Sequence, residues 1–186
     1  AKAAALATDV PAMEAEEYAS EAAVRALVGM GARHHAPSRH VRAEAAKAAY
    51  AAGSSDKDAH ELATQILAEA SAKTAVDRMK SPAEVGASVA RAMTAVGVPQ
   101  AKAVTIACDA AGLAVARRDA ELGAGQPEVA ASVKAAIIAA GAPVSNAPRM
   151  AARVLAQSAA EAAIAQGKAP VTVGLLAWEA ASAAGT

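Results

Sequence analysis

The feature that most constrains this chain is an internal repeat of 44 residues. Val and Gly each recur at this interval, and a column of Ala keeps the same period. The residues are Val41, Val85, Val129 and Val173; Gly53, Gly97, Gly141 and Gly185; and Ala48, Ala92, Ala136 and Ala180. Self-similarity at a period of this size indicates repeated supersecondary units that bury their apolar faces against their neighbours.

Between each Val and the Gly that follows it, the sequence predicts a short helix. The four segments read VRAEAAKAAYAAG, VGASVARAMTAVG, VAASVKAAIIAAG and VGLLAWEAASAAG. The final Gly fits the position after a helix C-terminus, where the chain turns left-handed and a residue without Cβ does so at little cost. Helix-start residues precede three of the segments: Ser38; Ser81, Pro82 and Glu84; and Gln126, Pro127 and Glu128. We expect Ser38 and Ser81 to act as N-caps.

A longer helix is predicted after each Gly and a polar or Pro-bearing turn. The long segments cover about residues 58–80, 99–122 and 148–166, and large apolar residues occupy the same column in each: Leu62, Ile106 and Met150. Apolar residues at i, i+4 and i+8 are typical of an amphipathic helix. The N-terminal part predicts a divergent long helix that starts between Asp9 and Pro11 and ends near Gly29 or Gly31.

Composition supports an all-α fold. Ala dominates the chain, Phe is absent, and the only aromatic residues are Tyr18, Tyr50 and Trp178. Ala is the best intrinsic helix former, whereas strands favour β-branched and aromatic residues. We therefore expect about eight helices as four helical-hairpin repeats of period 44, in one domain over residues 1–186. Full repeats cover about 41–84, 85–128 and 129–172, with partial copies at 1–40 and 173–186; the spacing fits either a compact bundle or a short α-solenoid.

Charge and hydropathy limit the classes of partner that the protein is expected to bind. Eighteen basic and eighteen acidic residues cancel, so the long-range field that attracts nucleic acid or anionic lipid is missing. No apolar run approaches the ~20 residues of a transmembrane helix. We expect a soluble protein that binds no nucleic acid and has no transmembrane segment. Because residue 1 is Ala and residues 1–8 do not resemble an intact signal peptide, the start fits a trimmed secreted or organellar precursor as well as an artificial boundary.

Faces made of Ala and Gly have two possible consequences. Small side chains let helix axes approach to the short end of the ~8–10 Å range, so that the helices simply pack closely. Alternatively, the room that small side chains leave is filled by a large apolar ligand, because protein interiors do not tolerate extensive voids.

The one concentrated basic run predicts a weak anion-binding site. It lies just before the expected helix start at Ser38 and consists of Arg33, His34, His35, Arg39, His40 and Arg42. Free amides at a helix N-terminus bind phosphate or carboxylate. The alternative is that the run pairs with acidic residues of the preceding helix, Glu14, Glu16, Glu17 and Glu21.

Metal and catalytic signatures are missing. His34, His35, His40 and His60 lack the spacing that places two imidazoles on one helix face, so we predict no metal site.

The single cysteine, Cys108, excludes a disulfide framework within the chain and is expected to behave as a small buried hydrophobe. No nucleophile or phosphate-binding motif occurs, and Asp56 and Asp58 fit helix capping. We expect a protein that is not an enzyme.

One segment resembles a known family. Residues 28–54, VGMGARHHAPSRHVRAEAAKAAYAAGS, are similar to part of the peridinin-chlorophyll proteins of dinoflagellates. That family is Ala-rich and soluble, with eight helices per domain around carotenoid and chlorophyll. In the family a His pair follows the Ala-rich run, whereas this chain has Ala49 and Tyr50. The resemblance implies an all-helical fold and a bound pigment.

The sequence therefore predicts a non-catalytic helical repeat protein that acts as a binding or structural scaffold, through a protein partner or self-association and without a cofactor. The expected partner surface is Leu175, Leu176 and Trp178, because the last repeat stops before a long helix that would cover it. One alternative is a soluble carrier of an apolar ligand such as a pigment or lipid. Another is an ice-binding protein, although Thr64, Thr74, Thr94 and Thr105 form no regular ladder.

Overall fold

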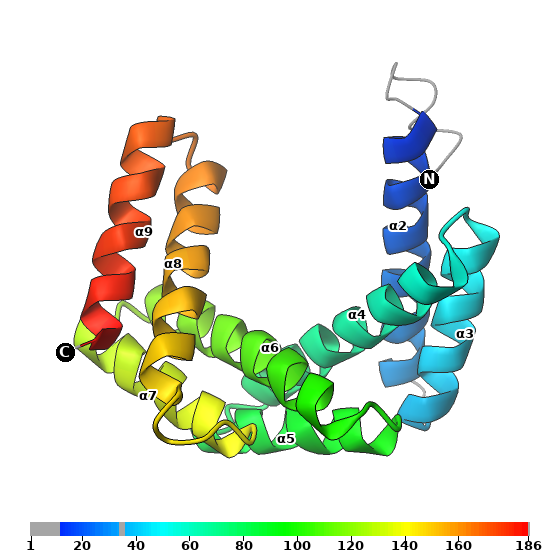
Figure 1. Ribbon diagram of the computed structural model, residues 1–186, viewed down its shortest axis with the longest axis horizontal. Helices are drawn as coiled ribbons and strands as arrows, with labels where there is room; N and C mark the ends of the chain where they lie inside the picture. The colour runs from blue at the N-terminus through cyan, green and yellow to red at the C-terminus, as the bar shows by residue number, and fades with distance from the viewer. Residues whose placement is uncertain (1–11, 34–35, 186) are drawn as a thin grey trace. The chain divides into compact units, whose positions relative to one another are not determined.

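The computed structural model describes residues 12–33 and 36–185, and in this part of the chain all regular structure is α-helical. Long and short helices alternate (Figure 1): α2 (Ala12–Arg33), α3 (Ser38–Ala51), α4 (Asp56–Asp77), α5 (Pro82–Ala95), α6 (Gln100–Glu121), α7 (Gln126–Ala139), α8 (Ala147–Ala165) and α9 (Pro170–Gly185). The prediction of an all-α fold with eight helices is confirmed.

The helix boundaries follow the sequence period. The short helices α3, α5, α7 and α9 begin at residues 38, 82, 126 and 170, and the long helices α2, α4 and α6 begin at residues 12, 56 and 100. Successive short helices start 44 residues apart, and so do α4 and α6. Helix α8 begins three residues later than the period requires, because the amides of Asn146 and Ala147 first donate to the Pro143 carbonyl in a turn.

Glycines end the short helices as predicted. Gly53, Gly97 and Gly141 have φ values of 116°, 73° and 109°, in the region that side chains with a Cβ disfavour. Gly185 is different, since it is the last residue of α9 itself and not a residue beyond the helix.

A second column of left-handed residues ends the long helices, and the sequence did not reveal it. Its members are Met79, Gly123 and Gly167, with φ values of 55°, 76° and 67°. In each case the backbone turns in the same way. For example, the Met79 amide donates to the Val76 carbonyl as the Gly123 amide donates to the Ala120 carbonyl. In the described turns, residues with positive φ therefore follow the long helices α4, α6 and α8 at the same 44-residue period as the glycines that follow the short helices.

Two predicted helix boundaries were wrong. Helix α2 continues through Gly29 and Gly31 to Arg33. Gly31 serves close packing instead, since a Cβ there would lie 2.4 Å from a methyl of Val41 in α3. Ser38 is the first helical residue of α3, and the N-cap is Pro37, without a side-chain hydrogen bond. The predicted start of α2 between Asp9 and Pro11 lies outside the described residues.

The predicted capping box at Ser81 is present. The Ser81 amide donates to the Glu84 carboxylate at 2.9 Å, and the Glu84 amide donates to the Ser81 hydroxyl at 3.4 Å. Hydrogen bonds from Ser81 also lower the pKa of Glu84. This local pairing fixes where α5 begins.

The chain divides into two compact units. The first contains residues 1–70 and 95–97, and the α2–α3 hairpin lies in it. Val24, Val28, Ala45 and Ala49 are buried in it. Ser20, also buried, donates to the Ala49 carbonyl at 3.3 Å, so that a polar group in this interior is satisfied.

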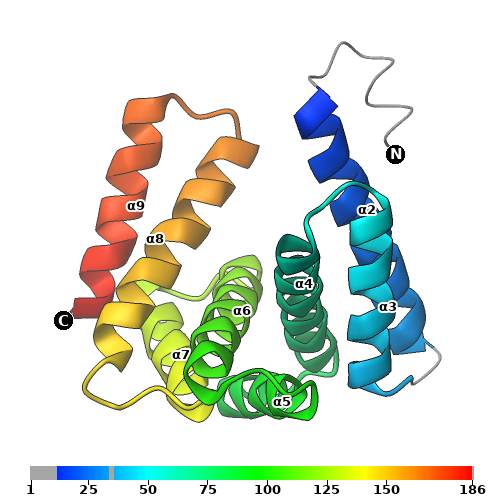
Figure 2. The ribbon, with the colours of Figure 1, turned by 45° about the vertical axis from the view of Figure 1, so that its right-hand side comes forward.

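The second unit contains residues 71–94 and 98–186. Here the long helix α6 packs against the long helix α8, and the short helix α7 packs against the short helix α9 (Figure 2). Helix α7 also contacts α6 and α8, and α8 contacts α9. The largest buried side chains in this unit include Met93, Val115, Val133, Ile137 and Val154.

Helices α5 and α7 approach each other backbone to backbone in the second unit. A Cβ on Gly86 in α5 would lie 2.0 Å from the Ala136 carbonyl oxygen in α7. Such a contact is possible only for a residue without a side chain, and it brings the two helices close together. At this point the small residues allow close helix packing and do not leave room for a ligand.

None of the helices in residues 12–33 and 36–185 is long and apolar enough to cross a membrane.

Candidate interaction surface

Helix α9 carries an exposed apolar stripe in the second unit. Val171, Leu175 and Trp178 are 76%, 57% and 68% exposed, and their i, i+4 and i+7 spacing places them on one side of the helix. Leu176, the third residue of the predicted surface, is half-buried. Large apolar side chains gathered in this way on a surface are typical of a protein-protein contact site.

Beside this stripe, α9 exposes positions that are buried in the preceding short helix. The α7 residues at these positions are Ala130, Val133 and Ile137, all buried. Their α9 counterparts, 44 residues later, are Gly174, which is exposed, and Ala177 and Ala181, which are half-buried. In α7, contacts with the neighbouring helices α6, α8 and α9 bury these positions. The corresponding side of α9 has no such cover among the described residues.

Helix α8 shows the same difference. In α6 the stripe made of Cys108, Gly112, Val115 and Ala116 is buried. The equivalent α8 residues are all half-exposed alanines: Ala152, Ala156, Ala159 and Ala160. We call these four alanines, together with Gly174, Ala177, Trp178 and Ala181, the tail face. Apart from Trp178, these residues stand at positions that are buried in α6 and α7.

A polar ladder runs beside the apolar contacts between long helices. Three ion pairs join residues that are 44 positions apart: Arg25–Glu69 at 3.2 Å, Arg117–Glu161 at 2.5 Å, and Asp109–Arg153. The first pair links α2 to α4, and the other two link α6 to α8. In these two helix pairs, equivalent positions therefore lie next to each other, and the offset between the paired helices equals the sequence period.

The two ladder carboxylates in the second unit have opposite pKa shifts. Burial raises the pKa of Glu161, but hydrogen bonds from Arg117 and Gln157 outweigh it and lower the pKa overall. For Asp109, burial dominates and raises the pKa, with only partial compensation by Arg153. Both partners of each pair remain partly exposed, which is typical of a pair that sets register more than stability.

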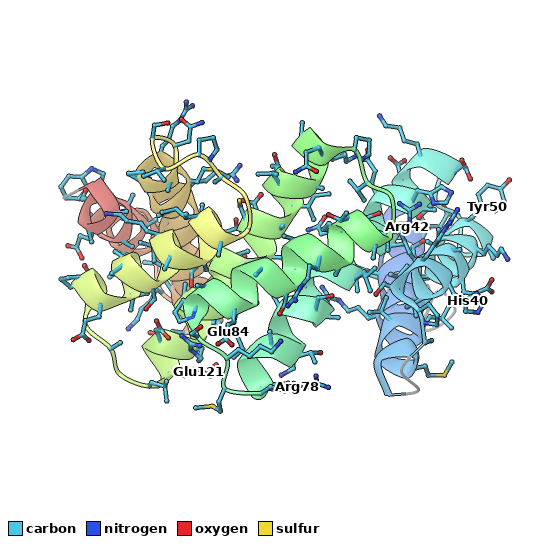
Figure 3. All side chains as sticks on the ribbon, turned by 90° about the horizontal axis from the view of Figure 1, so that it is seen from below. His40, Arg42, Tyr50, Arg78, Glu84 and Glu121 are labelled. Atoms are coloured by element: carbon cyan, nitrogen blue, oxygen red, sulfur yellow. The ribbon has the colours of Figure 1, made fainter. Side chains whose placement is uncertain are left out.

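The residues of the predicted anion site are only partly brought together. Arg39 and His40 are exposed in the first turn of α3. Figure 3 labels His40 and Arg42. Arg42 is half-buried and its guanidinium donates to the Thr64 hydroxyl of α4 at 3.5 Å. His34, His35 and the side chain of Arg33 lie outside the described residues. Anion binding by this run stays a prediction, as does its pairing with Glu14, Glu16 and Glu17; Glu21 pairs with Arg25.

The candidate carboxylates and the histidine near the start of α4 have partners within the same helix or its cap. Ser55 and Asp58 cap α4 with a hydroxyl-carboxylate distance of 2.7 Å, as the capping interpretation of this turn expects. His60 is exposed and lies 3.8 Å from Asp56 in the same helix. Among residues 12–33 and 36–185, no group of three or more His, Cys, Asp or Glu side chains gathers in a way that could hold a metal ion.

Cys108 is fully buried in α6, where its thiol lies 3.5 Å from the Ile137 carbonyl oxygen. Burial, and secondarily the charge of Asp109, raises its pKa to about 11. The thiolate is the reactive form of cysteine, so this side chain is a poor nucleophile at neutral pH. Its position matches the prediction of a small buried hydrophobe.

Sequence reasoning missed an ion pair between adjacent residues. Arg118 and Asp119 in α6 are joined at 2.6 Å, and both side chains are largely buried. Arg118 also donates to the Lys80 carbonyl at 2.9 Å, which ties α6 to the turn between α4 and α5. Figure 3 labels Arg78, which lies in this turn, and Glu84, in the first turn of α5. The other long helices have no charged residue at either position, so no repeat pattern revealed the pair.

Comparison of the chain with protein-family models, with curated protein sequences and with solved structures gave no match.

Proposed function

We propose that this chain is a non-catalytic helical repeat protein that binds another protein chain through the α9 end of its last hairpin. The observation that carries the proposal is the exposed apolar stripe of Val171, Leu175 and Trp178. Trp is the residue most enriched at the energetic centres of protein interfaces, and a buried Trp contributes a large contact area.

The tail face supports the same reading. In the preceding hairpin, the counterparts of seven of its residues are buried, whereas the counterpart of Trp178 is the half-buried Lys134. A helical surface of the same shape and polarity is therefore the kind of partner that fits it, since repeat proteins bury their apolar faces by stacking. Val171 and Leu175 lie beside this face and add large exposed apolar side chains. A surface that stays in contact with water gains nothing from such side chains, whereas a protein interface does.

A site-specific photo-crosslinker tests the proposal. The chain is made with a benzophenone amino acid in place of Leu175 and, as the matched control, in place of Lys57, an exposed polar residue of α4. After irradiation in an extract of the source organism, we expect protein adducts at residue 175 and none at residue 57. Mass spectrometry then identifies the adduct as a second copy or as another protein. Adducts at neither position, or equal labelling at both, would contradict the proposal.

A further inference from the structure

We infer that the tail face binds the first hairpin, α2–α3, of a second copy of this chain, so that copies associate head to tail. This inference rests on the proposed function and names its partner. It follows from three observations: the contacts that join successive hairpins inside the chain, the exposure of the matching positions on α2 and α3, and the charges at the proposed junction.

The contacts between successive hairpins define which repeat positions meet. In the long layer, Gly112 of α6 faces Val154 of α8, at 3.0 Å from an added Cβ to a Val154 methyl. In the short layer, Gly86 of α5 faces Ala136 of α7. Ala156 and Gly174 stand at the positions of Gly112 and Gly86 in the last hairpin. A hairpin that docks on the last one in the same way would place its residue equivalent to Val154 against Ala156. Its residue equivalent to Ala136 would lie against Gly174.

In the first hairpin, those meeting positions are apolar and, among the described residues, exposed or half-buried. Ala22 stands at the position of Val154 and is exposed, whereas Ile66, Ala110 and Val154 at the same position of the later helices are all buried. Tyr18, one helical turn before Ala22, is 55% exposed. Ala48 and Ala52 in α3, at the positions of the buried Ala136 and Ala140, are half-buried. We call Tyr18, Ala22, Ala48 and Ala52 the head face.

The charges at the junction are complementary. Inside the chain, Asp109 pairs with Arg153 at one position of the polar ladder. At that same position the first hairpin has Glu21. Docking of the head face on the tail face therefore places Glu21 of the second copy opposite Arg153. At the next ladder position, Arg25 meets the neutral Gln157, so the junction brings no like charges together.

A head-to-tail contact uses two different surfaces, so each association leaves one head and one tail face open. This property distinguishes it from a symmetric contact between two tail faces, and it provides a sharp experiment. Two variants each block one face: Gly174→Glu on the tail and Ala22→Glu on the head. Both residues are exposed helical positions, so both variants are expected to fold, which circular dichroism and thermal melting check.

Light scattering after gel filtration over a concentration series gives the molar mass, and the emission of Trp178, the only tryptophan, reports cover of the tail face. For the wild type we expect the mass to rise at least two-fold, with a shift of emission to shorter wavelength. Each variant alone is expected to remain a monomer with unshifted emission. An equimolar mixture of the two should form a dimer and nothing larger, because one open head meets one open tail.

A wild type that stays monomeric at high concentration with constant Trp178 emission would overturn the inference. So would association of Ala22→Glu alone, which would indicate a symmetric contact of tail faces. These outcomes differ from a failure of the proposed function. If the crosslinker at residue 175 forms adducts with a different protein, the head-to-tail inference fails but the proposed function stands. If it forms no adduct at all, the proposed function fails as well.

Discussion

Arg117 and Glu161 lie 44 residues apart in the sequence and 2.5 Å apart in space, joined by an ion pair between α6 and α8. Their separation is one repeat. Together with Asp109–Arg153 and Arg25–Glu69, this pair shows that equivalent positions are neighbours in the α6–α8 and α2–α4 helix pairs. The repeat is therefore not only a pattern in the sequence but also the rule by which the helices stack.

Charge reversal tests the contribution of this pair to stability. Arg117→Glu and Glu161→Arg each place like charges together, and we expect each to lower the free energy of unfolding by about 0.2–1 kcal/mol, the range for exposed pairs. The double variant restores opposite charges with the order reversed and should recover most of the loss. Urea denaturation of the four proteins measures the coupling. Additive losses in the double variant would show that the two side chains do not interact.

The same pair predicts a pH dependence. The pKa of Glu161 is lowered in the folded protein relative to its ordinary value of 4.5. Its contribution is therefore fully present above the unfolded pKa and is lost as the pH falls through the folded pKa. We expect the stability difference between the wild type and Glu161→Gln to be larger at pH 7 than at pH 3. A difference that does not change between these pH values would contradict the assigned shift.

Met79 is expected to be a site of stored backbone strain. It adopts a φ of 55° where the equivalent residues of later repeats are glycines, and its side chain is 77% exposed, so little packing is lost on its removal. Met79→Gly should raise the free energy of unfolding by about 1 kcal/mol, because a non-glycine residue pays a penalty of that order in the left-handed region. Met79→Ala is the control and should bring no such gain. Thermal and urea denaturation provide the measurement.

Two glycines at the same repeat position should respond to alanine with opposite signs. Gly86→Ala places a methyl against the Ala136 carbonyl oxygen, and we expect a loss of about 1–3 kcal/mol from overpacking. At Gly174 an added Cβ meets nothing within 4 Å in the single chain, so in the Ala22→Glu background, which is expected to stay monomeric, Ala at 174 should stabilise the helix by about 0.5–1 kcal/mol. Equal effects of the two substitutions would show that α5 and α7 are not in close contact.

Cys108 offers a probe of opening in the second unit. Because the thiol is buried and its pKa is raised to about 11, we expect almost no reaction with a disulfide reagent at pH 8 in the native protein. The unfolded chain should react at once. Low concentrations of urea should accelerate the reaction in parallel with unfolding. Rapid labelling of the native protein would contradict the described burial of this residue.

Much of the fold follows from periodicity that is visible in the sequence. The columns of Gly53 and of Val41 predict short helices at a constant spacing, and the observed starts of α3, α5, α7 and α9 keep that spacing. The glycine column that ends the long helices was missed because Met79 interrupts it. Gly31 was interpreted as a helix end, since a sequence does not distinguish a glycine needed for a turn from one needed for close packing against Val41.

The polar ladder and the tail face depend on spatial stacking, which the period alone does not specify. Opposite charges at Arg25 and Glu69 are visible in the sequence, but they indicate a contact only if neighbouring helices are offset by one whole repeat. The exposed stripe was partly predicted, through Leu175 and Trp178. Val171 was not included, because its position in the first turn of α9 is clear only once the helix start is known.

The most direct test of this stacking rule is a crosslinking measurement on paired cysteines. In a Cys108→Ala background, Leu113→Cys with Gln157→Cys places thiols one repeat apart, between the Asp109–Arg153 and Arg117–Glu161 pairs. Leu113→Cys with Arg149→Cys is the control, displaced by two helical turns, or about 12 Å. With a short bismaleimide, we expect intramolecular crosslinking of the 113–157 pair and little of the 113–149 pair. Equal or reversed yields would contradict the stacking of equivalent positions.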